Sequence, residues 1–369
     1  MRSPRRLRTA ADLLTAVPGI LGYEPAESLV VLPLAGRYGG AVLRFDLPPA
    51  ELHDDFAAGV VEHLLRFDDC DRIAVAAFTD APLGLDEPPH RPLVDAIAAL
   101  AADEGIEIAC AALRGGDGWC EFRGAEAGTL DELDAQRPPV AASVEEVGDI
   151  DPAADAERER FAAELAARSA RPLGVAAFAA ALHGLLDDRA AADADDALAR
   201  GWRAELVAGL GTPLHLEFAL ADAAFGERAG LEHATLWQHL ERELRGGQHG
   251  RLAPGGLVTD RANHDPVDLE RSAAAIGLLR RLVALAPEPF RPDLYAALGW
   301  LEWVRGGATL ATRYARECLE REPDHPLAAE VELLCAFAVV PAWIGMTGVG
   351  GGLGEHDFER LLGTGPDLE

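Results

Sequence analysis

Lysine is absent from this chain of 369 residues, so arginine supplies all 33 of its basic side chains. Without lysine the chain cannot form a Walker-type phosphate loop, whose motif ends in Gly-Lys-Ser/Thr. The sequence also has no Gly-x-Gly-x-x-Gly after its first expected strand, no Gly-x-Ser-x-Gly nucleophile elbow and no His-Glu-x-x-His zinc motif. With these motifs absent, the sequence identifies no catalytic residue and no cofactor. We expect no metal site.

Cysteine is scarce, and its pattern argues against a disulfide framework. The cysteines are odd in number and none forms a Cys-x-x-Cys pair, which is typical of reduced thiols in a cytosol. Cys110 and Cys120 either face each other across a hairpin or serve as two small apolar residues. The full set is Cys70, Cys110, Cys120, Cys318 and Cys335.

Long hydrophobic runs are also missing. No stretch approaches the roughly 20 apolar residues of a membrane-spanning helix, because His183 interrupts residues 174–186 and Pro341 interrupts residues 335–344. No apolar segment with the length of a signal-peptide core follows the N-terminal arginines. We therefore expect a cytoplasmic protein without a membrane partner.

Acidic residues outnumber basic ones by 62 to 33, which gives the chain a net charge of −29. This charge favours solubility and disfavours whole-surface binding to nucleic acid or to an anionic membrane. The exception is the cluster of Arg2, Arg5, Arg6 and Arg8, which is either a frayed start or a short anchor for an acidic partner. We expect no nucleic-acid partner, whereas a protein or peptide partner stays open and the oligomeric state is unknown.

The first 135 residues alternate between strand and helix patterns. Strands are expected over 28–34, 41–46, 72–78, 106–113 and 119–122, and helices over 48–67 and 91–104. The first two strands should form an antiparallel hairpin. The order strand-strand-helix-strand-helix-strand-strand predicts a mixed sheet with crossover helices, so we expect a mixed-sheet α/β domain over residues 1–135.

The rest of the chain is expected to be helical. Residues 136–155 lose periodicity and gain proline and acidic residues, which indicates a linker or an extended connection. Helical patterns fill 156–344, broken by a glycine-rich stretch at 246–263 that we expect to be a loop. Residues 345–369 contain many glycines and acids, and they are predicted to form a flexible acidic tail. The fold class is therefore α+β or α/β, with a mixed sheet followed by an all-α domain.

One helical pair has a tetratricopeptide-like spacing within a 34-residue window. Small residues at Gly299 and Ala311 should let two helices pack closely, although Glu302 and Ala315 stand where larger apolar residues are usual. A lone hairpin cannot bury its own face, so it must pack on neighbouring helices. The pair is either an ordinary part of an all-α domain or the wall of a peptide-binding groove. The candidate groove residues are Tyr295, Trp300, Trp303 and Arg313.

Two segments resemble a known family. ADLLTAVPGILGYEPAESLVVLPL at 11–34, followed by LRFDLP at 43–48, is similar to the actinobacterial domain-of-unknown-function family numbered 4192. ALGWLEWVRGGATLATRYARECLEREPDHPLA at 297–328 resembles the closing helices of that family. The resemblance brackets residues 7 to about 335. It implies an actinobacterial cytosolic protein with an α/β part and a helical part, and it implies no reaction.

Five polar residues lie at expected strand ends that share one edge of the sheet. The hairpin places Ser28 beside Asp46, with Arg44 on the same side as Asp46. A helix crossover should make the second and third strands parallel, so Asp80 and then Arg114 emerge at that edge. Open α/β sheets bind ligands there, and two carboxylates with an arginine suit a divalent cation, a polar metabolite or acid–base chemistry. The alternative is structural: Asp46 and Asp80 cap the following helices, and Ser28 closes a turn.

These patterns support two functions of different kinds. The first is a non-catalytic protein-interaction or scaffold protein that binds a protein or peptide through its helical domain. The alternative is a small-molecule or metal-dependent enzyme or binder, with its site at the carboxyl edge of the N-terminal sheet. A polar site at the sheet edge would favour the alternative, and an apolar groove on the helical face would favour the first. Whether the chain is an enzyme stays open.

Overall fold

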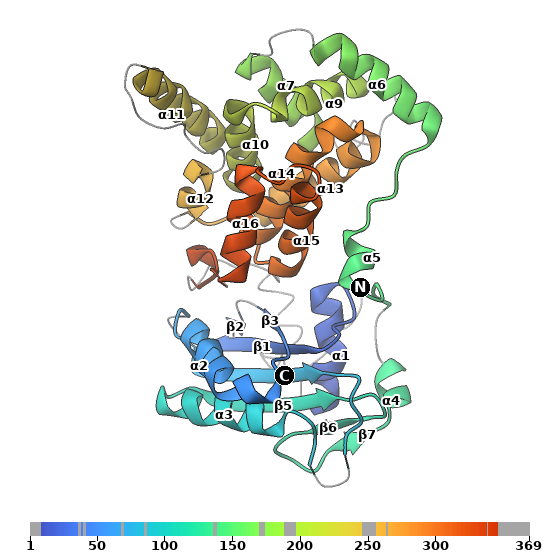
Figure 1. Ribbon diagram of the computed structural model, residues 1–369. Coiled ribbons are helices and arrows are strands. Elements are labelled where there is room, and N and C mark those ends of the chain that lie inside the picture. The colour runs from blue at the N-terminus through green and yellow to red at the C-terminus, as the bar shows by residue number, and fades with distance from the viewer. Residues whose placement is uncertain are drawn as a thin grey trace, which may run out of the picture. The chain divides into compact units, whose positions relative to one another are not determined.

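The chain divides into two compact units, which are described separately (Figure 1). One unit comprises Met1–Val147 with Ile344–Glu369, and the other comprises Gly148–Trp343. The division falls inside the stretch at 136–155 where the periodicity of the sequence is lost. The computed structural model describes residues 9–35, 38–39, 42–67, 70–84, 87–135, 139–169, 174–187, 197–245, 256–262, 265–337 and 339–345. The basic cluster at 2–8 lies outside these residues, as does the expected tail apart from its first residue.

The N-terminal unit is built on a mixed sheet, as the sequence predicts, with seven strands in the described residues. The strands are β1 (Ser28–Ala35), β2 (Tyr38–Gly39), β3 (Leu43–Asp46), β4 (Arg72–Phe78), β5 (Glu107–Arg114), β6 (Trp119–Glu121) and β7 (Ala127–Gly128). Their order is β2-β1-β4-β5-β6-β7, and β3 also pairs with β1. The β4–β5 pair is parallel and the other pairs are antiparallel. β3 and β4 run in the same direction, but β1 lies between them.

Helices cover both faces of this sheet (Figure 1). On one face α1 (Ala10–Leu21) packs on strand residues such as Val30 and Leu32. On the other face α2 (His53–Leu64) and α3 (Arg91–Asp103) pack on the alternate residues, such as Leu29 and Val31. Successive strand side chains point to opposite faces, so a continuous apolar run such as that of β1 is buried on both sides. Two short helices, α4 (Leu130–Asp134) and α5 (Val144–Gly148), follow the sheet.

The cysteines of β5 and β6 do not face each other. Cys120 on β6 is paired with Leu113 on β5, not with Cys110. Cys110 packs on the α1 side of the sheet, and Cys120 packs on the side of α2 and α3. All five cysteines are free thiols. The two act as small apolar residues, which was one of the two interpretations of the sequence.

The second unit consists of helices, as the sequence predicts. They are α6 (Asp155–Ser169), α7 (Val175–Leu186), α9 (Ala197–Leu210), α10 (Pro213–Phe225), α11 (Glu227–Arg245), α12 (Gly256–Ala262), α13 (Leu269–Leu285), α14 (Arg291–Val304), α15 (Ala308–Leu319) and α16 (Pro326–Ala336). The helix α12 corrects the expectation of a loop at 256–262, and the rest of the expected loop at 246–263 lies outside the described residues. Val258 and Ala262, one turn apart, are buried, so tertiary packing outweighs the glycine-rich composition around them. No helix in the described ranges combines the length and the apolar character needed to cross a membrane.

The helices α14 and α15 form a closely packed hairpin. A Cβ atom added to Gly299 would lie 3.2 Å from the Ala311 carbonyl oxygen and 3.3 Å from the Ala315 nitrogen. The backbones therefore approach each other where the sequence places its small residues. Every residue of α14 from Leu294 to Val304 is buried, which makes α14 a central helix of its unit.

Candidate functional site

The strand register places the expected site residues along one edge of the N-terminal sheet. Ser28 at the start of β1 is opposite Asp46 on β3 and opposite Phe78 on β4, and Phe78 is opposite Arg114 on β5. The hairpin register between Ser28 and Asp46 is the one that the sequence predicts. Because β1 lies between β3 and β4, this edge is formed by the start of one strand and the ends of three others.

Three of the expected residues are in direct contact on the α1 side of the sheet. Arg44 donates hydrogen bonds from Nη2 and Nε to the Ser28 hydroxyl, at 2.7 and 3.0 Å. The same Nη2 lies 2.7 Å from Oδ1 of Asp46, whose side chain is 83% exposed. The Ser28 hydroxyl donates to the Ala26 carbonyl oxygen at 2.6 Å, as expected for a residue that closes a turn. This cluster holds β1 and β3 together with its own hydrogen bonds.

The other two expected residues are not joined to this cluster by any hydrogen bond or ion pair between described residues. Arg114 lies with its Nε 3.7 Å from Oε1 of Glu24. Asp80 is exposed, and it takes part through its backbone N–H, which donates to Glu27. The capping alternative is wrong for both carboxylates, because the residue before α2 is Leu52 and the residue before α3 is His90. The helices begin several residues beyond Asp46 and Asp80.

Glu27 links the strand ends at this edge, and sequence reasoning missed it. Its carboxylate accepts hydrogen bonds from the Thr79 hydroxyl at 2.9 Å and from the Asp80 N–H at 2.7 Å. Its carbonyl oxygen accepts from the Leu47 N–H at 2.9 Å. Glu27 has a φ of 42°, in the left-handed region that non-glycine residues rarely adopt. A charged residue is thus held in an unfavourable backbone conformation where three strands meet.

Two histidines stand at the beginnings of the helices that follow this edge. His53 is the first residue of α2, and His90 directly precedes α3. Their ring centroids lie 6.1 Å apart. Nε2 of His53 and Nδ1 of His90 are buried and have no hydrogen-bond partner. A ring nitrogen in this state needs a water or a ligand to satisfy it.

His90 shares two properties with Glu27. Its φ is 62°, and the two are the only non-glycine residues with positive φ in the described part of the chain. The pKa of His90 is lowered from 6.5, first by burial and then by the neighbouring His53, while the Glu27 carboxylate raises it. The imidazole is therefore mainly neutral at pH 7. We call Glu27, His53, Thr79 and His90 the edge site.

The sequence held only weak signals for the edge site. Glu27 directly precedes the expected strand at 28–34, in a turn segment whose sequence has no pattern typical of a binding site. His90 follows Pro88 and Pro89, a pair that marks a turn before a helix but does not specify a left-handed residue. The left-handed conformation of both residues is set by tertiary contacts.

A metal centre is not formed by these side chains. Among the residues that the structure describes, no three histidine, cysteine, aspartate or glutamate side chains are arranged to hold a metal ion.

Three of the four expected groove residues, the aromatic ones, lie in the interior of the helical unit. Trp300 and Trp303 are 0% and 1% exposed, and Tyr295 is 8% exposed. The Trp300 indole donates to the Thr259 hydroxyl at 3.0 Å, and the Trp303 indole donates to the Val339 carbonyl oxygen at 2.8 Å. The aromatic rings are therefore core residues, and they do not line an open groove.

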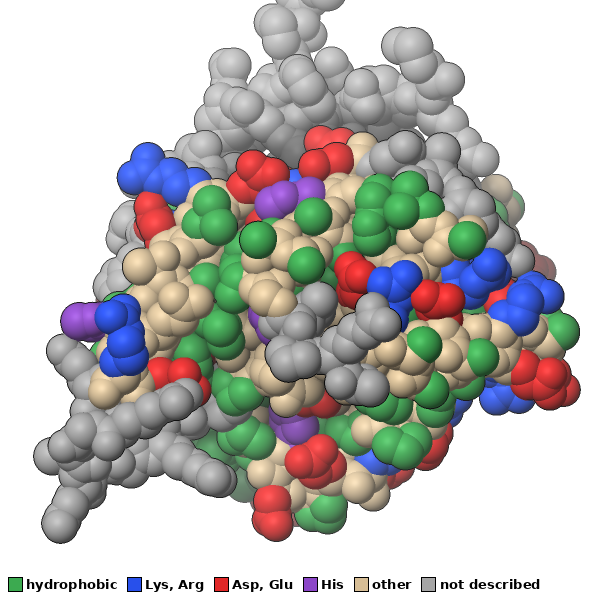
Figure 2. All heavy atoms as spheres, turned by 90° about the horizontal axis from the view of Figure 1, so that it is seen from above, with side chains coloured by type: hydrophobic (Ala, Val, Ile, Leu, Met, Phe, Trp, Pro, Cys, Tyr) green, Lys and Arg blue, Asp and Glu red, His purple; other side chains and the backbone are tan. Residues whose placement is uncertain are grey.

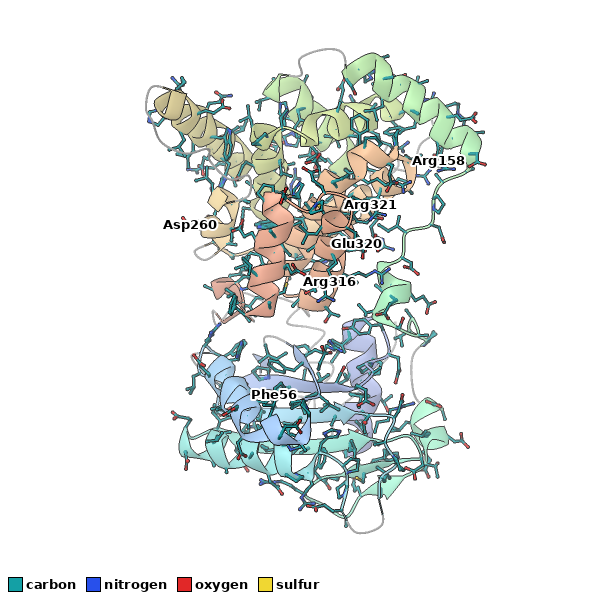
Figure 3. All side chains as sticks on the ribbon, in the orientation of Figure 1. Phe56, Arg158, Asp260, Arg316, Glu320 and Arg321 are labelled. Carbon is teal, nitrogen blue, oxygen red and sulfur yellow. The ribbon has the colours of Figure 1, made fainter. Side chains whose placement is uncertain are left out.

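Two arginines near the expected groove already have partners. The guanidinium of Arg321, labelled in Figure 3, stacks 4.9 Å from the Tyr295 ring centre. Arg313 is paired with Asp149 at 2.5 Å. Arg313 thus fixes the start of the helical unit.

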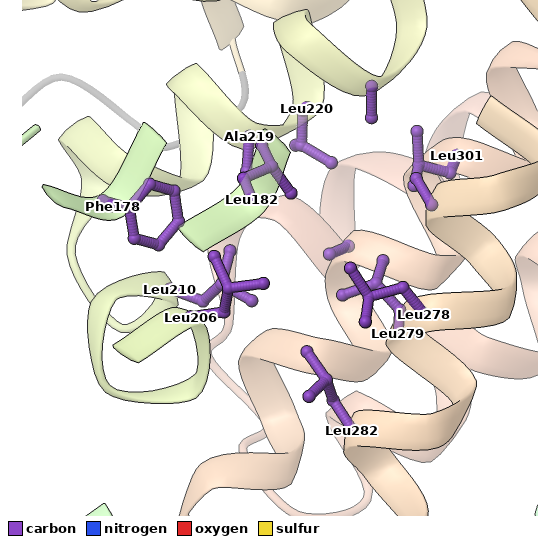
Figure 4. A pocket seen from close by; sticks show the side chains of 13 residues that line it. Phe178, Leu182, Leu206, Leu210, Ala219, Leu220, Leu278, Leu279, Leu282 and Leu301 are labelled. Carbon is purple, nitrogen blue, oxygen red and sulfur yellow. The ribbon is translucent and has the colours of Figure 1, made fainter. Parts of the chain in front are cut away.

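A small cavity lies among the helices of this unit (Figure 4). Its volume is about 20 Å³, and no polar surface lines it. Such a volume holds about one water molecule, which needs polar partners that this lining lacks. The cavity is a packing defect between helices, too small for a metabolite. Its lining includes Phe178, Leu182, Leu206, Leu279 and Leu301.

One buried carboxylate of the helical unit has a full set of partners. Asp222 is 0% exposed, and it accepts from Arg271 Nη2 at 2.5 Å and from His183 Nε2 at 2.7 Å. The other His183 nitrogen lies 2.9 Å from Glu227, and Arg271 also reaches Asp187 at 3.0 Å. This network ties α7, α10, α11 and α13 together and leaves no open position for a ligand. We assign it a structural role.

The comparisons with known proteins agree with the resemblance of the N-terminal and closing segments. Neither the curated proteins nor the solved structures contain a significant match to this chain. The sequence profile described as "Domain of unknown function (DUF4192)" matches residues 11–342, which span both units. The chain belongs to the DUF4192 family.

Proposed function

We propose that the protein binds a small polar ligand at the edge site of its N-terminal sheet. The observation that carries this proposal is the left-handed backbone of two non-glycine residues, Glu27 directly before β1 and His90 directly before α3. Left-handed backbone at a non-glycine residue costs roughly 1–2 kcal/mol. Such residues persist when surrounding contacts fix them, and they cluster at functional sites. Both positions would accept glycine or asparagine at a lower cost, so the side chains themselves account for their presence.

The position of the site supports the same function. Open α/β sheets bind ligands at the edge where helices start after parallel strands. The edge site lies at the end of β4 and at the beginnings of α2 and α3. It offers a carboxylate and two imidazoles, each with one ring nitrogen that lacks a partner. These groups recognise hydrogen-bonding ligands and are suited to proton transfer. The residues assign no reaction, so the proposal is a binding function.

The experiment is a thermal-shift screen of the full chain against metabolites and divalent cations. A ligand at 100 times its dissociation constant should add about 2.7 kcal/mol to the free energy of unfolding. The response should be lost in Glu27→Gln and retained in Asp46→Asn, which removes an exposed carboxylate on the opposite side of the same edge. If the ligand still stabilises Glu27→Gln but no longer stabilises Asp46→Asn, the ligand binds at the cluster of Ser28, Arg44 and Asp46 instead.

A protein-interaction function of the helical unit is the second candidate. Its support is the outer side of α16, where Leu333 and Phe337, one turn apart, are 58% and 73% exposed. Exposed apolar side chains at this spacing suit a helical or peptide partner. The test is a pull-down from the native host with the full chain and with Phe337→Ser. If the wild-type chain and Phe337→Ser retain a partner equally, the partner does not bind at α16.

We also propose that the protein works in the cytoplasm of an actinobacterium. The five free cysteines suit a reducing compartment, and the family resemblance supports the host group. Fractionation of the native host with an antibody to this chain tests the location.

A further inference from the structure

We propose that the ligand of the edge site carries a primary ammonium group, which the Glu27 carboxylate and the imidazoles of His53 and His90 hold together. This inference rests on the proposed binding function and names the chemistry of its ligand.

The first argument is the charge of Glu27. Its carboxylate accepts neutral donors, the Thr79 hydroxyl and the Asp80 N–H, and it forms no ion pair with any described residue. An anion held by neutral hydrogen bonds at an exposed edge gains most from a cationic ligand. The chain itself has no lysine to supply an ammonium group. A ligand is therefore the natural source of such a charge.

The second argument is the number of acceptors. A primary ammonium has three N–H donors and no acceptor. The edge site offers two imidazole nitrogens without a partner. It also offers the remaining acceptor capacity of the Glu27 carboxylate, which accepts from Thr79 and Asp80. The two rings approach within 6.1 Å, so one small group can reach both. The lowered pKa of His90 keeps its ring neutral and able to accept a hydrogen bond.

The third argument concerns an anionic ligand. An anion would meet the Glu27 carboxylate, and the arginines of this edge are already paired. Arg91, the first residue of α3, is paired with Asp95. Arg44 is hydrogen-bonded to Ser28 and paired with Asp46, and Arg114 faces Glu24. The positive ends of α2 and α3 favour an anion. In α2 this effect is opposed by Asp54 and Asp55, which lie in its first turn.

The whole chain favours a cation as well. Its net charge of −29 creates a field that concentrates small cations near the surface. The field is screened by salt over about 8 Å at physiological ionic strength. The short-range groups of the edge site must therefore provide the selectivity.

The test uses three probes with one carbon skeleton: propylammonium, 1-propanol and propionate. Each is titrated into the full chain labelled with ¹³C-histidine, and the signals of His53 and His90 are followed by NMR. Propylammonium should shift both signals, and its dissociation constant should be at least tenfold lower than that of 1-propanol. Glu27→Gln should weaken propylammonium at least tenfold, His90→Asn should weaken it as well, and Asp46→Asn should leave it unchanged.

The outcomes separate this inference from the proposed function. Propionate binding at His53 and His90, without propylammonium binding, would overturn the ammonium inference and keep a ligand site at the edge. Equal binding of propylammonium and 1-propanol would also overturn it, because charge would then play no part. If neither these probes nor the screened metabolites move the two signals, the binding function itself fails. The unfolding curve of each variant shows that a loss of binding is not a loss of fold.

Discussion

Two residues of the N-terminal unit depart from local conformational preference, one directly before β1 and one directly before α3. Glu27 and His90 both have positive φ, although glycine or asparagine would fit such positions better. Natural sequences break local rules chiefly at functional or strained sites, where the side chain is needed for another purpose. The residue scale therefore offers the sharpest tests, because stability and binding should respond to substitution in opposite directions.

Replacing His90 with asparagine should stabilise the protein and weaken ligand binding. Asparagine tolerates the left-handed region and suits the residue before a helix, so the free energy of unfolding should rise by roughly 0.5–1 kcal/mol. The imidazole acceptor is lost while Glu27 and His53 remain, so the ligand should bind the edge site more weakly. Urea denaturation and a binding titration of the same preparation measure both effects. A clear loss of stability would mean that His90 is a structural residue.

The pKa of His90 also predicts a dependence of stability on pH. Because burial lowers this pKa in the folded state from 6.5, the unfolded state binds the proton first as the pH falls. The contribution of His90 is fully present above about pH 6.5 and decreases as the pH falls toward the folded pKa. Unfolding midpoints of the wild-type chain and His90→Asn between pH 8 and pH 5 should diverge in acid, with the wild-type chain losing more. Parallel curves would contradict this prediction.

At the scale of elements, close packing and buried charge hold the helical unit together. The α14–α15 hairpin depends on a glycine where the two backbones meet, and four helices share the Asp222 network. Figure 3 shows side chains filling the space between these helices. Each arrangement predicts a destabilising substitution with a matched control in the same unit.

Gly299→Ala should destabilise the hairpin. The added methyl group would lie 3.2 Å from the Ala311 carbonyl oxygen, and overpacking of this kind costs about 1–3 kcal/mol. Gly277→Ala in α13 is the control, because no atom lies within 4 Å of its added Cβ. That substitution should stabilise the helix by up to about 1 kcal/mol. Thermal unfolding of both variants gives the comparison, and equal effects would contradict the close approach of α14 and α15.

Asp222→Asn should destabilise the helical unit by roughly 3–5 kcal/mol, because it leaves the Arg271 guanidinium without its buried counter-charge. Asp187→Asn is the matched control, since Asp187 pairs with the same arginine but is 58% exposed. It should cost less than about 1 kcal/mol. Denaturant unfolding distinguishes the two, and a small effect of Asp222→Asn would show that the network is replaceable.

Elements with a periodic pattern could be predicted from the sequence, and sites set by tertiary contacts could not. The expected hairpin of residues 28–34 and 41–46 was enough to pair Ser28 with Asp46. The burial of Trp300 and Trp303 was missed because an aromatic residue looks the same in a groove and in a core. The position of β1 between β3 and β4 could not be predicted. A helix crossover fixes the relative direction of the two strands that it connects, but it does not make them neighbours. Glu27 and His90 carry no local signal for left-handed backbone.

At the scale of the whole molecule, acidic side chains outnumber basic ones by 62 to 33. Figure 2 shows one face on which acidic, arginine and apolar side chains alternate without a large patch of one kind. The net charge of −29 therefore acts as a general field, and specific recognition must come from local groups. All residues of the edge site belong to the N-terminal unit.

The N-terminal unit should fold without the helical unit. It has a core on each face of its sheet, so a fragment of residues 1–147 should show the circular dichroism of a mixed sheet and cooperative unfolding. It should also retain the ligand response of the full chain. Persistent aggregation of the fragment would show that the two units depend on one another for folding.

The most direct test of the central claim is the NMR titration of the ¹³C-histidine-labelled full chain with propylammonium. We predict that the signals of His53 and His90 shift with one dissociation constant, while those of His183 and His215 stay in place. Shifts confined to histidines of the helical unit, or uniform shifts of all histidines, would contradict a ligand site at the edge of the N-terminal sheet.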